Sequence, residues 1–261
     1  VQVSPVTKFH SGAGYQYEDS VIYGFTHTNK GHWNLCHIPL LPVTGTPTPG
    51  DYCSPFSHER ESAAPGYYQV FLDRYGVDAQ LSSTLRCAFH KYTYPAGAAP
   101  AVLADLQRSN EHVRAWDIRK EGDNVFAGWQ QTGEKMYFYA VANRPVTGIE
   151  PVVEGDREVR IVRFGEGDGA LELRIGFSFV SEKNARENLE AEMLGKSFAE
   201  VRSEATATWN DLLGRIRVEG GTEREKGLFY SSLYRSFLWP ALRSDVNGEF
   251  TDVDGKVINP G

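Results

Sequence analysis

A run of nine residues near the start of the chain combines side chains that can bind a sugar. Residues 26–34 read Thr-His-Thr-Asn-Lys-Gly-His-Trp-Asn. Sugars present hydroxyl groups and an apolar ring face, so their sites pair polar side chains with an aromatic plate. The residues of this type are His27, Lys30, His32, Trp33 and Asn34. The alternative is structural, with His27 holding a turn and Trp33 packing in the core.

Spacing argues against two other chemistries. His27, His32 and His37 recur every five residues, which places neighbours on opposite faces of a strand and misses the helical register of zinc ligands. The run Ser57-His58-Glu59 contains the residue types of a hydrolase triad, but adjacent side chains point apart and no Gly-x-Ser-x-Gly motif is present. We therefore expect neither a three-histidine metal site nor a serine hydrolase, and we interpret His58 and Glu59 as structural.

Composition excludes several classes of protein. The 261 residues are 41% hydrophobic and 12% aromatic, which is enough for a packed core. The formal net charge of −7 argues against nucleic acid as a partner, because such proteins cluster Lys and Arg. No window is long and apolar enough for a membrane helix. Three irregularly spaced cysteines predict neither a disulfide framework nor a zinc site.

Two periodicities divide the chain. Up to about residue 179, short runs of alternating polar and apolar residues are separated by Gly, Pro, Asn and Asp, which predicts a β-sandwich. In 159–164, arginines alternate with apolar residues, so we expect one wet face and one buried face. After Ser181 the period becomes 3.6, and apolar residues from Phe198 to Ile216 predict a helix. Thr222 and Glu225 form a capping-box pattern for a second helix that ends before Pro240.

Several short motifs follow one another along the chain. They are Gly24–Thr28, Phe56–Val70, Tyr75–Ala79, Phe89–Pro95, Phe177–Ala185, Asn188-Leu189, Trp209-Asn210 and Phe229–Arg235. In their order and rough spacing, over almost the whole chain, these motifs resemble those of glycoside hydrolase family 92, the calcium-dependent α-mannosidases.

The resemblance implies a fold that is mainly β. We expect an antiparallel β-supersandwich in 1–180, a helical linker in 181–221 and, in 222–261, the first helix of an (α/α)6 catalytic barrel. The implied activity is that of an exo-acting, inverting α-mannosidase that removes mannose from glycans, as in N-glycan degradation. The implied cofactor is calcium, and the implied location is periplasmic or secreted.

Family 92 enzymes carry their catalytic carboxylates and calcium ligands in motifs of the helical domain that this sequence does not contain. We therefore expect the chain to be part of a longer protein, with the remainder of the catalytic domain as its partner, and we nominate no catalytic or metal-binding residue. The turn-like run Asp245-Val-Asn-Gly lacks the glycine and glutamate positions of an EF-hand loop and favours a hairpin. It matches an aspartate-rich segment of the family, so Asp245 is a candidate substrate contact.

The loop after His27-Thr28 departs from the glycine-rich run that is commoner in the family. Here it is bulkier and partly basic, with Lys30, His32 and Trp33. A changed linkage preference or a charged leaving group would fit such a loop. Two other classes stay open, namely a non-catalytic carbohydrate-binding sandwich and a sandwich-plus-helical-barrel glycosidase or phosphorylase of another family.

Overall fold

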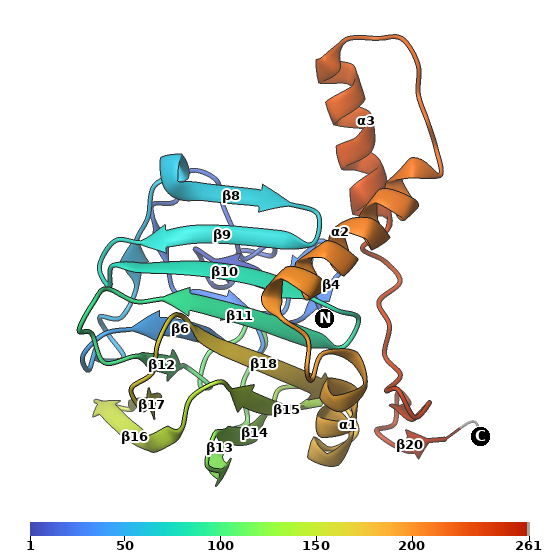
Figure 1. The fold of residues 1–261 in the computed structure, drawn as a ribbon. Coiled ribbons are helices and arrows are strands. Elements are labelled where there is room, and N and C mark those ends of the chain that lie inside the picture. Colours follow the sequence, from blue (N-terminus) through green and yellow to red (C-terminus); the bar gives the residue numbers. More distant parts are fainter. Residues whose placement is uncertain (260–261) are drawn as a thin grey trace.

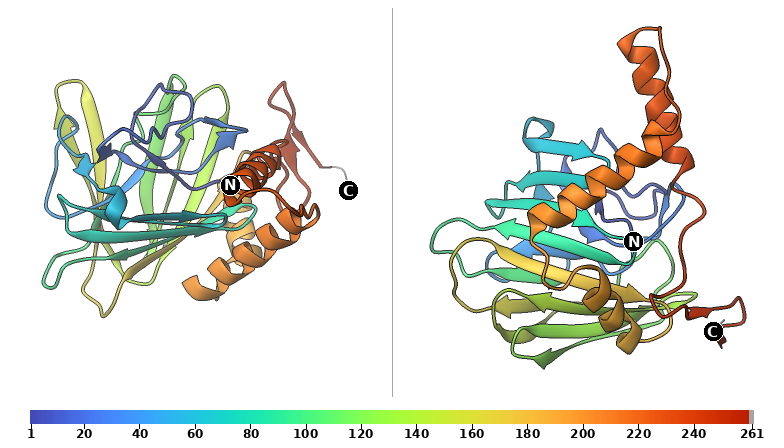
Figure 2. Two further views of the ribbon diagram at one scale, coloured as in Figure 1. Left: turned by 90° about the horizontal axis from the view of Figure 1, so that it is seen from above. Right: turned by 45° about the vertical axis from the view of Figure 1, so that its right-hand side comes forward.

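Two antiparallel β-sheets pack face to face and are followed by three helices, in a computed structural model that describes residues 1–259 (Figures 1 and 2). The smaller sheet has six strands in the order β1 (Ser4–Val6), β3 (Gly24–Thr26), β6 (Leu40–Val43), β12 (Ala101–Ala104), β17 (Arg157–Phe164) and β16 (Val146–Glu154). The larger has eight strands in the order β13 (Ala115–Gly122), β14 (Val125–Gln131), β15 (Lys135–Ala142), β18 (Leu171–Ser178), β11 (Cys87–Thr93), β10 (Val77–Ser83), β9 (Tyr67–Leu72) and β8 (Glu61–Ala64).

Three short two-stranded ribbons and one 3₁₀ turn complete the β part. The ribbons are β2 (Val21–Ile22) with β7 (Ser54–Pro55), β4 (Asn29–Lys30) with β5 (Trp33–Asn34), and β19 (Phe250–Thr251) with β20 (Val257–Ile258). The turn η1 spans His58–Arg60, and there the Ser57 hydroxyl accepts a hydrogen bond from the Glu59 amide. His58 lies between the Glu61 carboxylate and the Tyr17 carbonyl, so its contacts are structural.

The core lies between the two sheets because each strand alternates its side chains across the sheet. In β15, Met136, Phe138 and Ala140 are buried, and the residues between them are only partly so. Strand β17 behaves as predicted, since Val159 and Ile161 are buried whereas its arginines are partly exposed. The expected sandwich is therefore confirmed, and every strand pairing among the described residues is antiparallel.

Helix α1 (Glu182–Glu192) packs on the outer face of the larger sheet, against β15 and β18. Its start is fixed by Ser181, whose hydroxyl accepts from the Asn184 amide. The helix comes unusually close to the sheet at Gly176, where a Cβ atom would lie 2.0 Å from the Ala185 carbonyl oxygen. Only glycine permits this approach.

The two predicted helices are present, and the second has its predicted cap. Helix α2 (Phe198–Gly214) begins at a capping box of Ser197 and Glu200, and α3 (Glu223–Ser236) begins at the predicted box of Thr222 and Glu225. The first turns of α2 lie on the sheet, with Phe198, Val201 and Ala205 buried. Its far end and all of α3 project away from the sandwich (Figure 1), and α3 has no buried residue.

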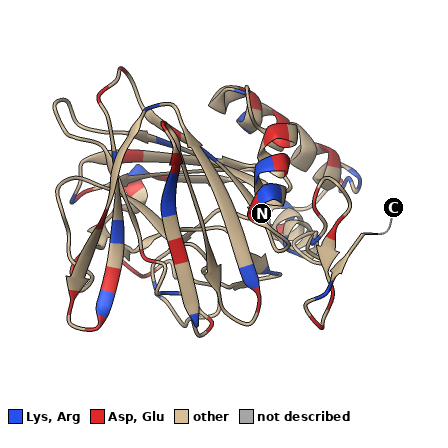
Figure 3. Ribbon diagram, turned by 90° about the horizontal axis from the view of Figure 1, so that it is seen from below, with Lys and Arg blue, Asp and Glu red and all other residues tan. Residues whose placement is uncertain are grey.

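Charged residues are spread over the surface rather than gathered by sign. Figure 3 shows basic and acidic residues mixed along the same strands and helices. No helix among residues 1–259 is both long and apolar enough to cross a membrane.

Candidate functional site

The proposed sugar-facing run folds as the β4–β5 hairpin. Asn29 pairs with Asn34 and Lys30 with Trp33, which leaves a two-residue turn. Gly31 occupies the first position of that turn at φ +63°, a conformation that favours glycine. The side chains of Lys30, His32 and Trp33 at the tip are exposed, that of Trp33 at 58%. An aromatic plate, an imidazole and an ammonium group therefore project together from Trp33, His32 and Lys30.

The other two residues of the predicted set are inside the protein. His27 is fully buried, its Nε2 atom lies 3.0 Å from Nε2 of His90, and its ring packs on Phe177. Burial lowers the pKa of His27 to about 3. Asn34 is also buried, and its Oδ1 accepts from the Thr26 hydroxyl and the Cys36 amide. Contact of His27 or Asn34 with a sugar does not fit this placement, because neither side chain reaches the surface.

Asp245 is likewise held within the protein rather than presented to a ligand. Its carboxylate accepts hydrogen bonds from the Ser178 hydroxyl at 2.6 Å and from the side-chain amides of Asn184 and Asn188 at 2.9 and 2.7 Å. The predicted turn is present, with the Gly248 amide donating to the Asp245 carbonyl. Asp245 therefore anchors the segment after α3 to α1, and a substrate contact does not fit its burial.

The structure adds Trp239 to the exposed group at the hairpin. A side chain built on Gly31 would begin 3.9 Å from the Cβ atom of Trp239, so the hairpin turn and the segment after α3 lie side by side. The Trp239 side chain is 53% exposed. Its only signal in the sequence is a tryptophan before Pro240, which does not reveal that the segment returns to the hairpin.

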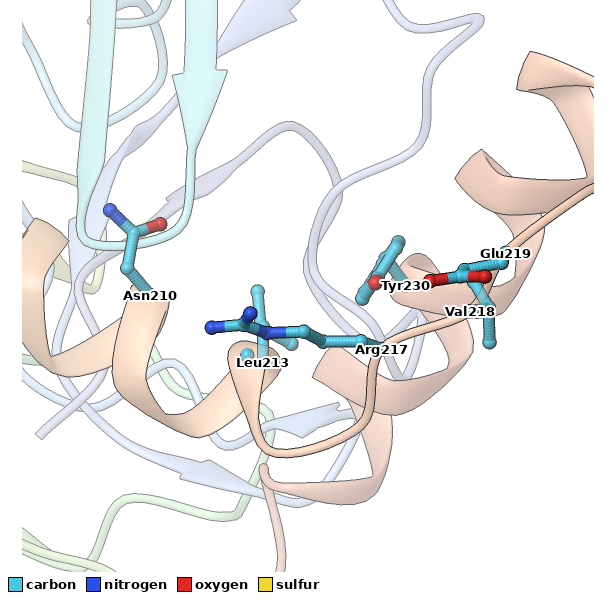
Figure 4. Close-up of a pocket in the computed structure, with 7 residues that line it drawn as sticks. Asn210, Leu213, Arg217, Val218, Glu219 and Tyr230 are labelled. Carbon is cyan, nitrogen blue, oxygen red and sulfur yellow. The ribbon is translucent and has the colours of Figure 1, made fainter.

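A hollow lies elsewhere, between the end of α2 and the middle of α3. It has a volume of about 570 Å³, and Figure 4 shows the side chains of Leu213, Arg217 and Tyr230 around it. The two segments that border it also carry exposed apolar residues, Ile216 after α2 and Leu228 in α3. An open hollow between two projecting helices with exposed apolar residues is typical of a packing surface.

Residues 1–259 contain no group of three or more His, Cys, Asp or Glu side chains arranged to hold a metal ion. These residues thus offer no cluster of acidic side chains for the calcium that the family resemblance implies. All three cysteines are free, with Cys36 and Cys87 buried and Cys53 partly buried.

The β-sandwich continues into helices that project from it and carry exposed apolar side chains, which is the arrangement expected at the start of a helical domain. The family model described as "Glycosyl hydrolase family 92 N-terminal domain" matches residues 1–189, and the model of the catalytic domain of the same family matches residues 184–261. The chain therefore belongs to glycosyl hydrolase family 92. The catalytic-domain match begins within α1 and includes α2 and α3, whereas our linker bounds of 181–221 stay a prediction.

Known proteins are similar to nearly the whole length of this chain. A family 92 α-mannosidase of Bacteroides thetaiotaomicron superposes with a TM-score of 0.91 at 25% identity, over 100% of this chain and 40% of that one. A family 92 inverting mannosidase of the same species gives 0.85 at 25% identity, over 98% of this chain and 38% of that one. An uncharacterized secreted glycosidase of Arthroderma benhamiae is 24% identical, over 95% of this chain and 38% of its own length. The chain thus spans about two fifths of these relatives.

Proposed function

We propose that the complete protein is an exo-acting α-mannosidase that hydrolyses mannosides of glycans with inversion, and that this chain supplies the sandwich and the start of the catalytic domain. The observation that carries the proposal is the match of the whole chain to family 92 α-mannosidases, one of them described as inverting and one solved with mannoimidazole. The secreted relative supports a secreted or periplasmic location.

Hydrolysis of a glycosidic bond requires catalytic groups that the hairpin does not supply. An inverting glycosidase uses a general acid and a general base about 6.5–9.5 Å apart, with a water between the base and the sugar. We nominate no such pair in this chain. The hairpin would instead contribute binding, with Trp33 stacking on a ring and His32 and Lys30 bonding to hydroxyl or charged groups of the substrate. Calcium, if the complete enzyme uses it, would be held by residues of the remaining catalytic domain.

The remaining catalytic domain is also the partner that the helices require. Leu228, Phe237 and Leu242 are exposed apolar side chains on α3 or after it, and none of them faces the sandwich core. Apolar surface of this kind is stabilised when it is covered. We propose that further helices of the same domain pack over α3 and fill the hollow beside Tyr230.

The proposed function predicts release of mannose from the non-reducing end of α-mannosides by the complete enzyme. Proton NMR during the reaction should detect β-mannose first, because a single displacement by water inverts the anomeric centre. Chelation of calcium should abolish turnover by the complete enzyme, and added calcium should restore it. This chain by itself should be inactive. A first product in the α form would contradict inversion. Mannoside binding without turnover would favour the carbohydrate-binding alternative.

The tip of the hairpin predicts a difference between substrates. We expect Trp33→Ala or His32→Ala in the complete enzyme to lower kcat/KM on a mannose disaccharide by roughly ten- to a hundred-fold, since each contact is worth about 1–3 kcal/mol. The loss on an activated aryl mannoside should be smaller if the tip serves the leaving group. Val153→Ala, which removes an exposed apolar side chain from β16, is the matched control. Unchanged kinetics in both tip variants would assign the hairpin a structural role only.

A further inference from the structure

We propose that His37 is a positioning residue, which holds the β4–β5 hairpin so that its tip is placed for the substrate. This inference rests on the proposed function, because it assigns the hairpin tip to the leaving-group side of a glycan. His37 is buried and does not reach the tip, so it would act through the backbone of the hairpin rather than by contact with a sugar.

His37 joins the two legs of the hairpin at its base. Its Nδ1 atom lies 2.8 Å from Oγ1 of Thr28, the residue before β4, while His37 itself follows β5. Its Nε2 atom lies 3.0 Å from Oε2 of Glu111. A carboxylate only accepts, so Nε2 carries the hydrogen and the Thr28 hydroxyl donates to Nδ1. The Leu35 amide also donates to the Thr28 carbonyl at 3.0 Å, which closes the base.

Glu111 and Thr132 connect that base to the larger sheet. The Thr132 hydroxyl donates to Oε2 of Glu111 at 2.7 Å and lies 3.2 Å from Nε2 of His37. Thr132 is buried in the turn between β14 and β15, so it moves with the sheet. The hydrogen bond from His37 lowers the pKa of Glu111 to about 2, against some opposing desolvation. The acceptor is therefore an ionised carboxylate at neutral pH, and bonds to charged groups are the stronger kind.

The second leg of the hairpin is hydrogen-bonded to Ser109 and Asn110, which precede Glu111 in the segment between β12 and β13. The side-chain amide of Asn110 donates to the Asn34 carbonyl at 2.6 Å, and the Ser109 hydroxyl donates to the Leu35 carbonyl at 2.7 Å. The tip, by contrast, projects into solvent. The base of the hairpin is therefore held by hydrogen bonds, while its tip is exposed. In such an arrangement the scaffold sets the position of the residues that contact a ligand.

A loosened base should affect the longer substrate more. Misplacement of a contact by about 1 Å can cost on the order of a hundred-fold in rate, and only a substrate that reaches the tip is sensitive to it. An aryl mannoside with a good leaving group depends less on contacts beyond the terminal sugar. The ratio of kcat/KM between a disaccharide and an aryl mannoside therefore reports the position of the tip, whereas a general loss of stability would lower both values together.

The test compares four variants of the complete enzyme: His37→Ala, His37→Gln, Thr132→Val and the control Tyr75→Phe. The control also removes one buried hydrogen bond, from the Tyr75 hydroxyl to the Tyr52 carbonyl, at a distance from the hairpin in sequence. We expect His37→Ala to lower kcat/KM about ten-fold or more on the disaccharide and less than about three-fold on the aryl mannoside. Thr132→Val should shift the ratio in the same direction, and His37→Gln, which retains a donor for Glu111, should restore part of it.

Hydrogen exchange measured by mass spectrometry gives a readout independent of activity. Amides of residues 28–35 should exchange faster in His37→Ala and at the wild-type rate in Tyr75→Phe. Unchanged exchange there, or an unchanged substrate ratio in an active enzyme, would overturn the role of His37. If His37→Ala does not fold, the same two measurements, the substrate ratio and the exchange of residues 28–35, are made on Thr132→Val and test the proposal there. A wild-type enzyme that cleaves neither substrate would instead refute the proposed function, so the two failures are distinguishable.

Discussion

Replacement of Gly176 with alanine should destabilise the protein by about 3 kcal/mol or more, because the added methyl group would overlap the backbone of α1. The new Cβ would lie 2.0 Å from the Ala185 carbonyl oxygen and 2.9 Å from the Cβ of Leu189. A clash with backbone cannot be relieved by a change of rotamer, so α1 would have to move off β18. Thermal or urea unfolding measures the loss, and a decrease of roughly 6 °C or more in Tm is expected.

Gly148→Ala is the matched control for this prediction. Gly148 also lies in a strand, but a Cβ at that position would meet nothing within 4 Å. Loss of chain freedom in the unfolded state should then leave stability unchanged or raise it by up to about 1 kcal/mol. Equal effects of the two substitutions would mean that the close approach of α1 is not what requires glycine at position 176.

The elements were predictable because local patterns determine them. The alternating run 159–164 lies within strand β17, and the Thr222–Glu225 capping box begins α3 as predicted. In both cases the signal lies within a few residues of the element. The close packing of α1 was less visible, although a glycine inside a strand, as Gly176 is in β18, is a known sign of a close approach by another backbone.

The candidate site was only partly predictable, because exposure depends on partners that are distant in the chain. The run 26–34 contains five side chains suited to sugars, and the sequence does not show which of them face inward. The partner of His27 is His90, which is 63 residues away, and Asp245 bonds to Ser178 at a separation of 67 residues. Neither pairing leaves a periodic signal. Lys30, His32 and Trp33 at the tip remain the proposed contacts, with Trp239 added beside them.

The buried pair His27 and His90 leads to the second large effect, a loss of stability in acid. Both rings are fully buried, and burial lowers the pKa of both, that of His27 to about 3. Their other ring contacts are with Phe177, Phe25 and Tyr92, none of which carries a charge that could compensate a proton. Two protonated rings would also place an N–H against an N–H across the 3.0 Å contact.

In the unfolded chain each imidazole binds a proton near pH 6.5, while the folded protein excludes it down to about pH 3 for His27. The unfolded state therefore binds more protons in this window, so the free energy of unfolding is greatest above pH 6.5 and falls as the pH falls, by about 1.4 kcal/mol per unit for each histidine. Between pH 7.5 and pH 5 the pair would cost roughly 4 kcal/mol. Urea unfolding from pH 7.5 to pH 5 should show this dependence of the free energy of unfolding on pH. His90→Gln should reduce the slope by about one proton, although it should also lower the stability at pH 7.5.

His112→Gln is the control, because it removes an exposed imidazole and should leave the slope unchanged. A slope in His90→Gln equal to that of the wild type would mean that the buried pair does not govern acid sensitivity.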